Sequence, residues 1–241
     1  TLLLLTLKEL RLLYANPRTR LLFAVPFFLL ILLKIVGAPQ LLAYLAGERW
    51  ATTLLAVLAA YLVTMLAAQL FANGLGYEGP ALLLTFITPQ PLWLAIAARN
   101  LAQGAIATLQ FGLLTLLTLT ALPSASAAGL ELPWTLFPYL LLVALAAGNQ
   151  LTQRYPRRFS AALERKDRVA PAATAWLFAT LAGAGALATA LWRLSIAVES
   201  SWLLASLPLL GALVYGASLP ATLRHMEQHK GALMAAIARR D

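Results

Sequence analysis

The chain has 241 residues, of which 61% are hydrophobic and 11% charged, with a mean hydropathy of +0.79 and a formal net charge of +9. A soluble globule of this size cannot bury so much apolar surface, so the composition indicates an integral membrane protein. The chain contains no cysteine, which excludes disulfides, iron–sulfur clusters and thiolate zinc sites.

The N-terminal segment, residues 1–16, is predicted to form an interfacial helix. At about 100° per residue, Leu3, Leu7, Leu10 and Tyr14 share one face and the basic residues lie off it. An Asn-Pro pair follows and predicts the end of the helix. The apolar run precedes the basic residues, which is the reverse of a secretory signal, so no signal peptide is expected.

Six apolar stretches approach the roughly 20 residues that a membrane-spanning helix needs. They cover residues 21–36, 50–71, 91–122, 134–151, 170–192 and 201–219. We therefore predict an all-α integral membrane protein with one domain over residues 1–241, made of the interfacial helix, a six-span bundle over 21–219 and a tail over 220–241. In the fifth span, Ala182, Ala186 and Ala190 form a stripe of small residues that predicts close helix packing, within the subunit or across a dimer.

Lysine and arginine concentrate in alternate connections. Fourteen lie in residues 1–20, 152–169 and 220–241, whereas the other connections hold only Lys34, Arg49 and Arg193. Because positively charged loops stay in the cytoplasm, both termini are predicted to be cytoplasmic. The basic run from Arg154 to Arg168 is mainly a topological anchor, with contact to anionic lipid or to a partner protein as a second role. This asymmetry explains most of the net charge, so no nucleic-acid partner is expected.

A polar, turn-rich segment, FANGLGYEGPALLLTFITPQP, joins the second and third spans over residues 71–91 on the cytoplasmic side. Residues 79–88 have room for about two or three helical turns, closed by Pro89 and Pro91. The segment is either a short helix that lies under the membrane or on another protein, or an ordinary interhelical loop.

Five short motifs, taken in their order along the chain, carry a resemblance to a known family. They are Asn-x-x-Gly-x-Glu-Gly at 73–79, Thr-Pro at 88–89, Arg-Asn-Leu-Ala at 99–102, Gly-Asn-Gln-Leu-Thr at 148–152 and Tyr-Pro-Arg-Arg at 155–158. In this order, and with the predicted topology, the chain resembles ABC type-2 exporter permeases, the membrane-spanning subunits of bacterial ATP-binding cassette transporters. One branch of that family often has Gly-Lys-Asn where this chain has Ala98-Arg99-Asn100, which keeps the charge and lacks the glycine.

The resemblance implies that the segment after the second span is a coupling helix that docks on a separate ATPase subunit, and that residues 1–16 form an elbow helix. Residues 82–87 would supply the docking surface. The coupling residues implied are Asn73, Gly76, Glu78, Gly79, Leu83 and Pro89. Glu78 has a second interpretation as an acid favoured by the dipole at a helix start.

The resemblance also implies a location in the bacterial cytoplasmic (inner) membrane, export of an unidentified substrate, and a second permease copy or a paralogue as partner. The chain has no G-x-x-x-x-G-K-[ST] phosphate loop, so it is not expected to be an enzyme. ATP and magnesium are expected in the partner ATPase, and no cofactor is expected in this chain.

Polar residues in the third span are candidates for lining a transport path: Arg99, Asn100, Gln103 and Gln110. A charge at mid-membrane costs about 2.5 to 3.5 kcal/mol, so Arg99 should face protein, water or headgroups. The alternative role is hydrogen bonding between helices. Both interpretations stay open.

Two other functional classes remain alternatives, an ion-gradient-driven secondary transporter and a non-transporting scaffold subunit of a membrane complex. All nine acidic residues map to loops or helix ends, which counts against proton coupling. His225 and His229 lie four residues apart without an evident third ligand, so no metal site is predicted.

Overall fold

The computed structural model of the protein is helical throughout the part of the chain that it describes, and no strand occurs there. Its described residues are 2–36, 40, 50–76, 86, 91–121, 130–155 and 170–238. The elements are α1 (Leu2–Ala15), α2 (Pro17–Ile35), α4 (Trp50–Gln69), η2 (Phe71–Asn73), α6 (Leu92–Ala121), α7 (Glu131–Arg154), α8 (Pro171–Ala197), α9 (Trp202–Gln228) and α10 (Lys230–Ala238).

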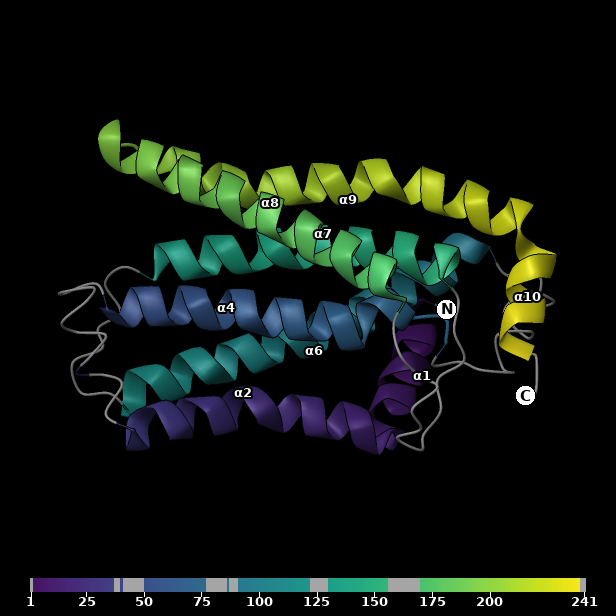
Figure 1. Ribbon diagram of the computed structural model, residues 1–241, viewed down its shortest axis with the longest axis horizontal. Helices are drawn as coiled ribbons and strands as arrows, with labels where there is room; N and C mark the ends of the chain where they lie inside the picture. The colour runs from purple at the N-terminus through teal and green to yellow at the C-terminus, as the bar shows by residue number, and fades with distance from the viewer. Residues whose placement is uncertain are drawn as a thin grey trace.

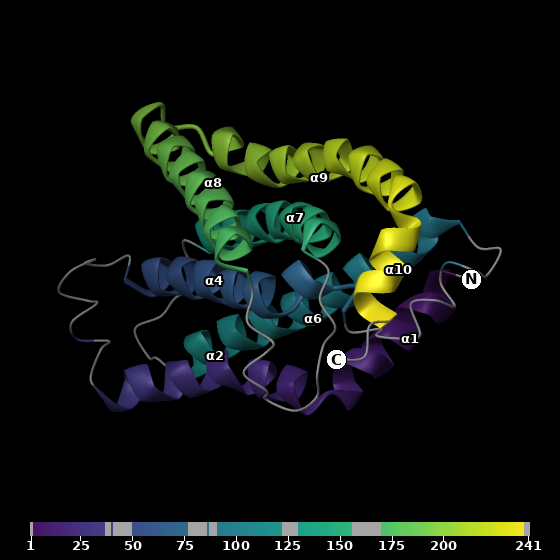
Figure 2. The same cartoon turned by 45° about the vertical axis from the view of Figure 1, so that its right-hand side comes forward.

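The long helices α2, α4, α6, α7, α8 and α9 run back and forth between the two ends of the molecule, with α8 inclined to the others, as Figures 1 and 2 show. The short elements α1, η2 and α10 lie together at one end, where α2 begins and α7 and α9 finish. We call this the basic end, because the described cations Lys8, Arg11, Arg154 and Arg224 belong to the helix segments that meet there. The alternation agrees with the back-and-forth path predicted from the sequence.

Five helices are long and apolar enough to cross a membrane, which makes the chain a candidate multi-pass membrane protein. They are Thr52–Asn73, Leu92–Thr120, Glu131–Arg154, Pro171–Ala197 and Trp202–Gln228. The first predicted span corresponds to α2, which is helical up to Ile35, one residue before the predicted end. Among its described side chains, however, it has only the shorter apolar stretch Thr19–Phe28. Membrane crossing by the first predicted span, residues 21–36, therefore stays a prediction.

Helix α7 lies at the centre of the packing and contacts α4, α8, α9 and η2. Gly211 of α9 lets that helix approach closely, because a Cβ at this position would lie 3.1 Å from both the Cα and the carbonyl oxygen of Tyr139 on α7. On the side facing α6, the rings of Phe111 and Phe137 stack with centroids 4.4 Å apart. The core is thus built around α7.

The small-residue stripe predicted on the fifth span does not pack within the described chain. Ala182, Ala186 and Ala190 are exposed on α8, and a Cβ added to Gly183 would meet no heavy atom within 4 Å. The buried face of α8 instead carries Leu177, Leu181, Ala184 and Ala188. The prediction that the stripe packs within the subunit is therefore wrong for the described residues. The alternative, packing across a dimer, stays a prediction.

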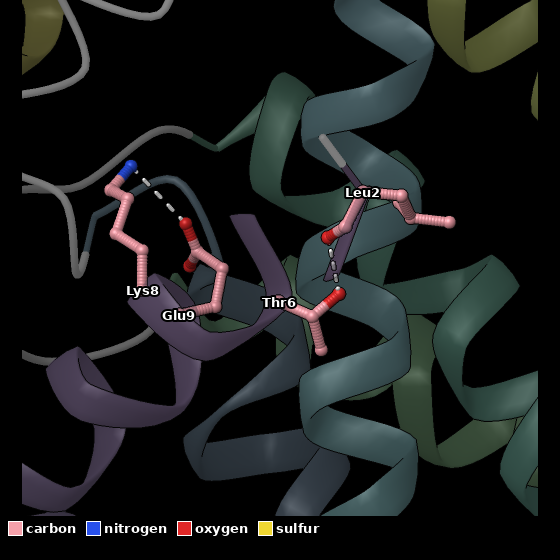
Figure 3. A network of polar contacts seen from close by, with 4 residues as sticks. All are labelled: Leu2, Thr6, Lys8 and Glu9. Carbon is pink, nitrogen blue, oxygen red and sulfur yellow. Dashed lines mark hydrogen bonds and ion pairs between the residues drawn. The ribbon is translucent and has the colours of Figure 1, made fainter. Parts of the chain in front are cut away.

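Helix α1 ends at Ala15, and Pro17 begins α2, as the Asn-Pro pair predicts. The helix packs on α6 and α2 and buries Glu9 and Leu13, while Leu3 and Tyr14 stay exposed. Lys8 Nζ lies 3.3 Å from Glu9 Oε1, and Thr6 donates a hydrogen bond to the Leu2 carbonyl. Figure 3 draws both contacts as dashed lines. The ion pair offsets the cost of burying the Glu9 carboxylate beside the bundle.

Candidate functional site

The start of the predicted coupling segment forms a tight, buried turn after α4. Residues 70–76 are all buried, and the turn is closed by backbone hydrogen bonds from Gly74 N to Phe71 O at 3.3 Å and from Gly76 N to Asn73 O at 3.0 Å. Two of the predicted coupling residues, Asn73 and Gly76, lie in this turn. We call residues 70–76 the anchored turn.

Helix α7 holds the anchored turn at two points. A Cβ at Gly148 would lie 2.6 Å from Phe71 Cβ and 2.8 Å from the Phe71 carbonyl carbon, so only glycine permits this approach of helix to turn. One helical turn further along, the hydroxyl oxygen of Thr152 accepts a hydrogen bond of 3.0 Å from Leu75 N. Both residues belong to the Gly-Asn-Gln-Leu-Thr motif at 148–152, which therefore acts as a clamp on the turn.

Helix α6 contacts the anchored turn from another side. A Cβ at Gly74 would lie 3.0 Å from Arg99 Cδ and 3.7 Å from Gln103 Nε2. Both α6 side chains are buried, with 4% and 3% of their surface exposed. The turn is thus packed between α6 and α7, so a displacement of its backbone would press on both helices.

The remaining predicted path residues connect α6 to other helices. Asn100 Nδ2 donates a hydrogen bond of 2.6 Å to the Tyr215 hydroxyl on α9, and Gln110 Nε2 donates one of 3.3 Å to the Phe23 carbonyl on α2. Both side chains are buried. These contacts fit the helix-bonding interpretation of the polar residues, while a role in lining a path stays a prediction.

The other predicted coupling residues, Glu78, Gly79, Leu83 and Pro89, lie outside the described residues. Within the predicted docking range, Phe86 is described. It is buried in a small cluster with Leu75, Ile96, Met226 and Leu233, and its carbonyl accepts a hydrogen bond from Lys230 Nζ on α10. The Phe86 side chain therefore faces the chain itself rather than an outside partner.

Sequence reasoning missed the partners that hold the turn. Phe71, Gly74 and Tyr215 contact segments that are distant in the sequence, just as Leu75 bonds to Thr152, 77 positions further along the chain. The only usable signal was the motif at 148–152, which the sequence singled out without indicating what it touches.

Two cavities are lined by residues outside the anchored turn. One, of about 280 Å³, is apolar and lies between α4, α7 and α8, with Thr53, Ala60, Leu136 and Trp192 among its lining residues. The other, of about 380 Å³, lies between the ends of α7 and α9 and is lined by polar and basic residues.

The two histidines near the end of α9 stack on each other, with ring centroids 4.1 Å apart. Among the described residues, no group of three histidine, aspartate or glutamate side chains is placed to hold a metal ion. Comparison with family models, with curated proteins and with solved structures finds no match for this chain.

Proposed function

We propose that this chain is the membrane-spanning permease subunit of an ABC exporter. It would work as a homodimer or with a paralogue, coupled to a separate ATPase subunit that binds ATP and magnesium at the bacterial inner membrane. The proposal rests on the motif resemblance and is supported by five helices of membrane-spanning length. Its substrate is taken from the cytoplasm or from the inner leaflet.

The observation that carries the proposal is the anchored turn. A coupling segment transmits force only if it is fixed to the spans, and here the residues that lead into it contact α6 through Gly74 and α7 through Phe71 and Leu75. Rigid helices move as units, so a push on the segment beyond Gly76 would shift both helices together. An ordinary interhelical loop has no need of so many buried contacts.

The first test is purification of the full chain from its native membrane, followed by identification of stoichiometric partners by mass spectrometry. The expected result is a phosphate-loop ATPase in near-equal amount. Repeated recovery without such an ATPase, or with a different stoichiometric partner, would overturn the proposal. Transport that persists when ATP hydrolysis is blocked would favour the secondary transporter instead.

The second test places a charge in the predicted coupling segment. We expect Glu78→Arg and Leu83→Arg to weaken ATPase association or stimulated ATP turnover by at least about tenfold while the chain stays inserted, because a mismatched charge at a docking surface costs about 1.4 kcal/mol or more. Glu131→Arg is the matched control, since Glu131 is an exposed acid at the start of α7 on the opposite end of the bundle. Normal association and turnover in both coupling variants would contradict the coupling role.

A further inference from the structure

The cavity at the basic end, between the last turns of α7 and α9, has features that the proposed function does not use. Its volume of about 380 Å³ falls within the range of roughly 300 to 1,000 Å³ that is typical of small-ligand sites. It is lined by Gln150, Gln153, Arg154, Ala221, Thr222, Arg224, His225 and Gln228. We call it the basic cavity.

The charged side chains that line the basic cavity are all positive. Arg154 comes from α7 and Arg224 from α9, so two guanidinium groups approach the same space from different helices. No acidic residue is among the lining residues, although Glu227 lies on the same helix as Arg224. Arginine is the side chain best suited to phosphate, because its planar guanidinium donates two parallel hydrogen bonds to phosphate oxygens.

Two further lining residues are buried and have a polar atom without a partner. Gln153 and Thr222 are 5% and 2% exposed, and neither Gln153 Nε2 nor Thr222 Oγ1 has a hydrogen-bond partner among the described residues. Leaving a buried donor unpaired costs about 1 to 3 kcal/mol, so such groups are normally satisfied. An amide N–H and a hydroxyl can both donate a hydrogen bond, so acceptor oxygens are the ligand chemistry that complements them.

We propose that the basic cavity binds the phosphate of an anionic phospholipid headgroup. The cavity lies at the ends of two candidate spans, where the headgroups of the basic-side leaflet would meet the protein. A zwitterionic headgroup would bring an ammonium group beside the two arginines, and no lining residue is an acid that could pair with it. The site therefore selects anionic over zwitterionic lipids, and this selection does not depend on coupling to an ATPase.

The experiment uses the full chain in detergent micelles, with lipid binding counted by native mass spectrometry and followed by thermal unfolding. Three probes are compared: phosphatidylglycerol, phosphatidylcholine and inorganic phosphate. We expect phosphatidylglycerol to bind about tenfold more tightly than phosphatidylcholine, with an affinity that falls as salt rises. Equal binding of the two lipids would overturn the proposal, and displacement of phosphatidylglycerol by inorganic phosphate would assign the cavity to free phosphate instead.

Substitutions of the lining residues test whether the lipid binds in the basic cavity. The double change Arg154→Gln and Arg224→Gln removes two exposed side chains without touching the core, and we expect it to abolish the preference for phosphatidylglycerol. The matched control, Arg11→Gln with Arg193→Gln, removes the same charge from exposed positions elsewhere and should keep the preference. Thr222→Val keeps the side-chain shape and should weaken binding several-fold; a control double variant as defective as the cavity variant would overturn the assignment.

Discussion

Helices α7 and α9 are similarly long and apolar, yet their surroundings differ. In the most apolar stretch of α7, 61% of the residues are buried, whereas in that of α9 the share is 11%. Helix α7 is covered by its own chain, through α4, α8 and α9. Helix α9 leaves Leu209 and Leu213 about two-thirds exposed, at 68% and 70%. Hydropathy therefore indicates that a helix avoids water without indicating whether protein or lipid covers it.

The largest expected difference between the two helices comes from shortening one leucine on each. Leu145→Ala in α7 should cost about 2 to 5 kcal/mol of unfolding free energy, because Leu145 is 5% exposed and its loss leaves a cavity among packed neighbours. Leu213→Ala in α9 should stay within about 0.5 kcal/mol. Unfolding in mixed micelles measures both, and equal costs would break the comparison.

Glycine substitutions test whether the contacts of α7 are as tight as described. Gly148→Ala should destabilise the protein by about 1 to 3 kcal/mol, because its Cβ would collide with the Phe71 backbone. Gly183→Ala in α8 should instead stabilise it by about 0.5 to 1 kcal/mol, because the added Cβ meets nothing and alanine favours helix. One thermal or denaturant unfolding assay measures the change in unfolding free energy for both variants. The two changes are expected to have opposite signs, so changes of the same sign would contradict the described contacts.

Removal of the Thr152 hydroxyl tests the polar half of the clamp. Thr152→Val should cost about 1 to 2 kcal/mol, because the Leu75 N–H is then buried without a partner. The control is Thr180→Val on α8, whose exposed hydroxyl bonds only to the Trp176 carbonyl of its own helix. Hydrogen exchange at the Leu75 amide should rise in the first variant alone, and unchanged protection would mean that Thr152 does not hold the turn.

The smallest effect is expected at the turn between α8 and α9. Glu199 has a positive φ of 51°, and the flanking bonds from Glu199 N to Ile196 O and from Ser200 N to Ser195 O form a Schellman motif, which favours glycine. Glu199→Gly should therefore stabilise the protein by about 1 kcal/mol, measured as a higher unfolding temperature. A lower temperature would show that the Glu199 side chain makes a compensating contact.

The positions of the helices could be predicted from the sequence. The ends of the helices and the contacts between them could be predicted only in part. The predicted span 50–71 matches α4 and η2 closely, because an uninterrupted apolar run between polar connections leaves few alternatives. The predicted span 201–219 stops before the end of α9 at Gln228. Span prediction counts apolar side chains, whereas the helix continues through Arg224 and His225 as long as its backbone bonds persist.

The candidate site was less accessible to prediction for a physical reason. Gly148 and Gly183 are both glycines inside apolar helices, so local sequence treats them alike, yet one touches Phe71 and the other faces open space. Likewise, nothing near Thr152 in the sequence indicates that its hydroxyl accepts a hydrogen bond from the Leu75 N–H. Such contacts are set by the approach of distant helices, which residue spacing along one helix does not encode.

The hydrogen bond from Leu75 to Thr152 also has a consequence for the order of synthesis. The two residues are 77 positions apart, so at about 5 to 20 residues per second the acceptor is made roughly 4 to 15 seconds after the donor. The third long helix, α6, is made within that interval, while the turn that precedes it still lacks the Thr152 hydrogen bond. The clamp is therefore a late event in biogenesis, because the anchored turn is fixed only after the end of α7 has been made.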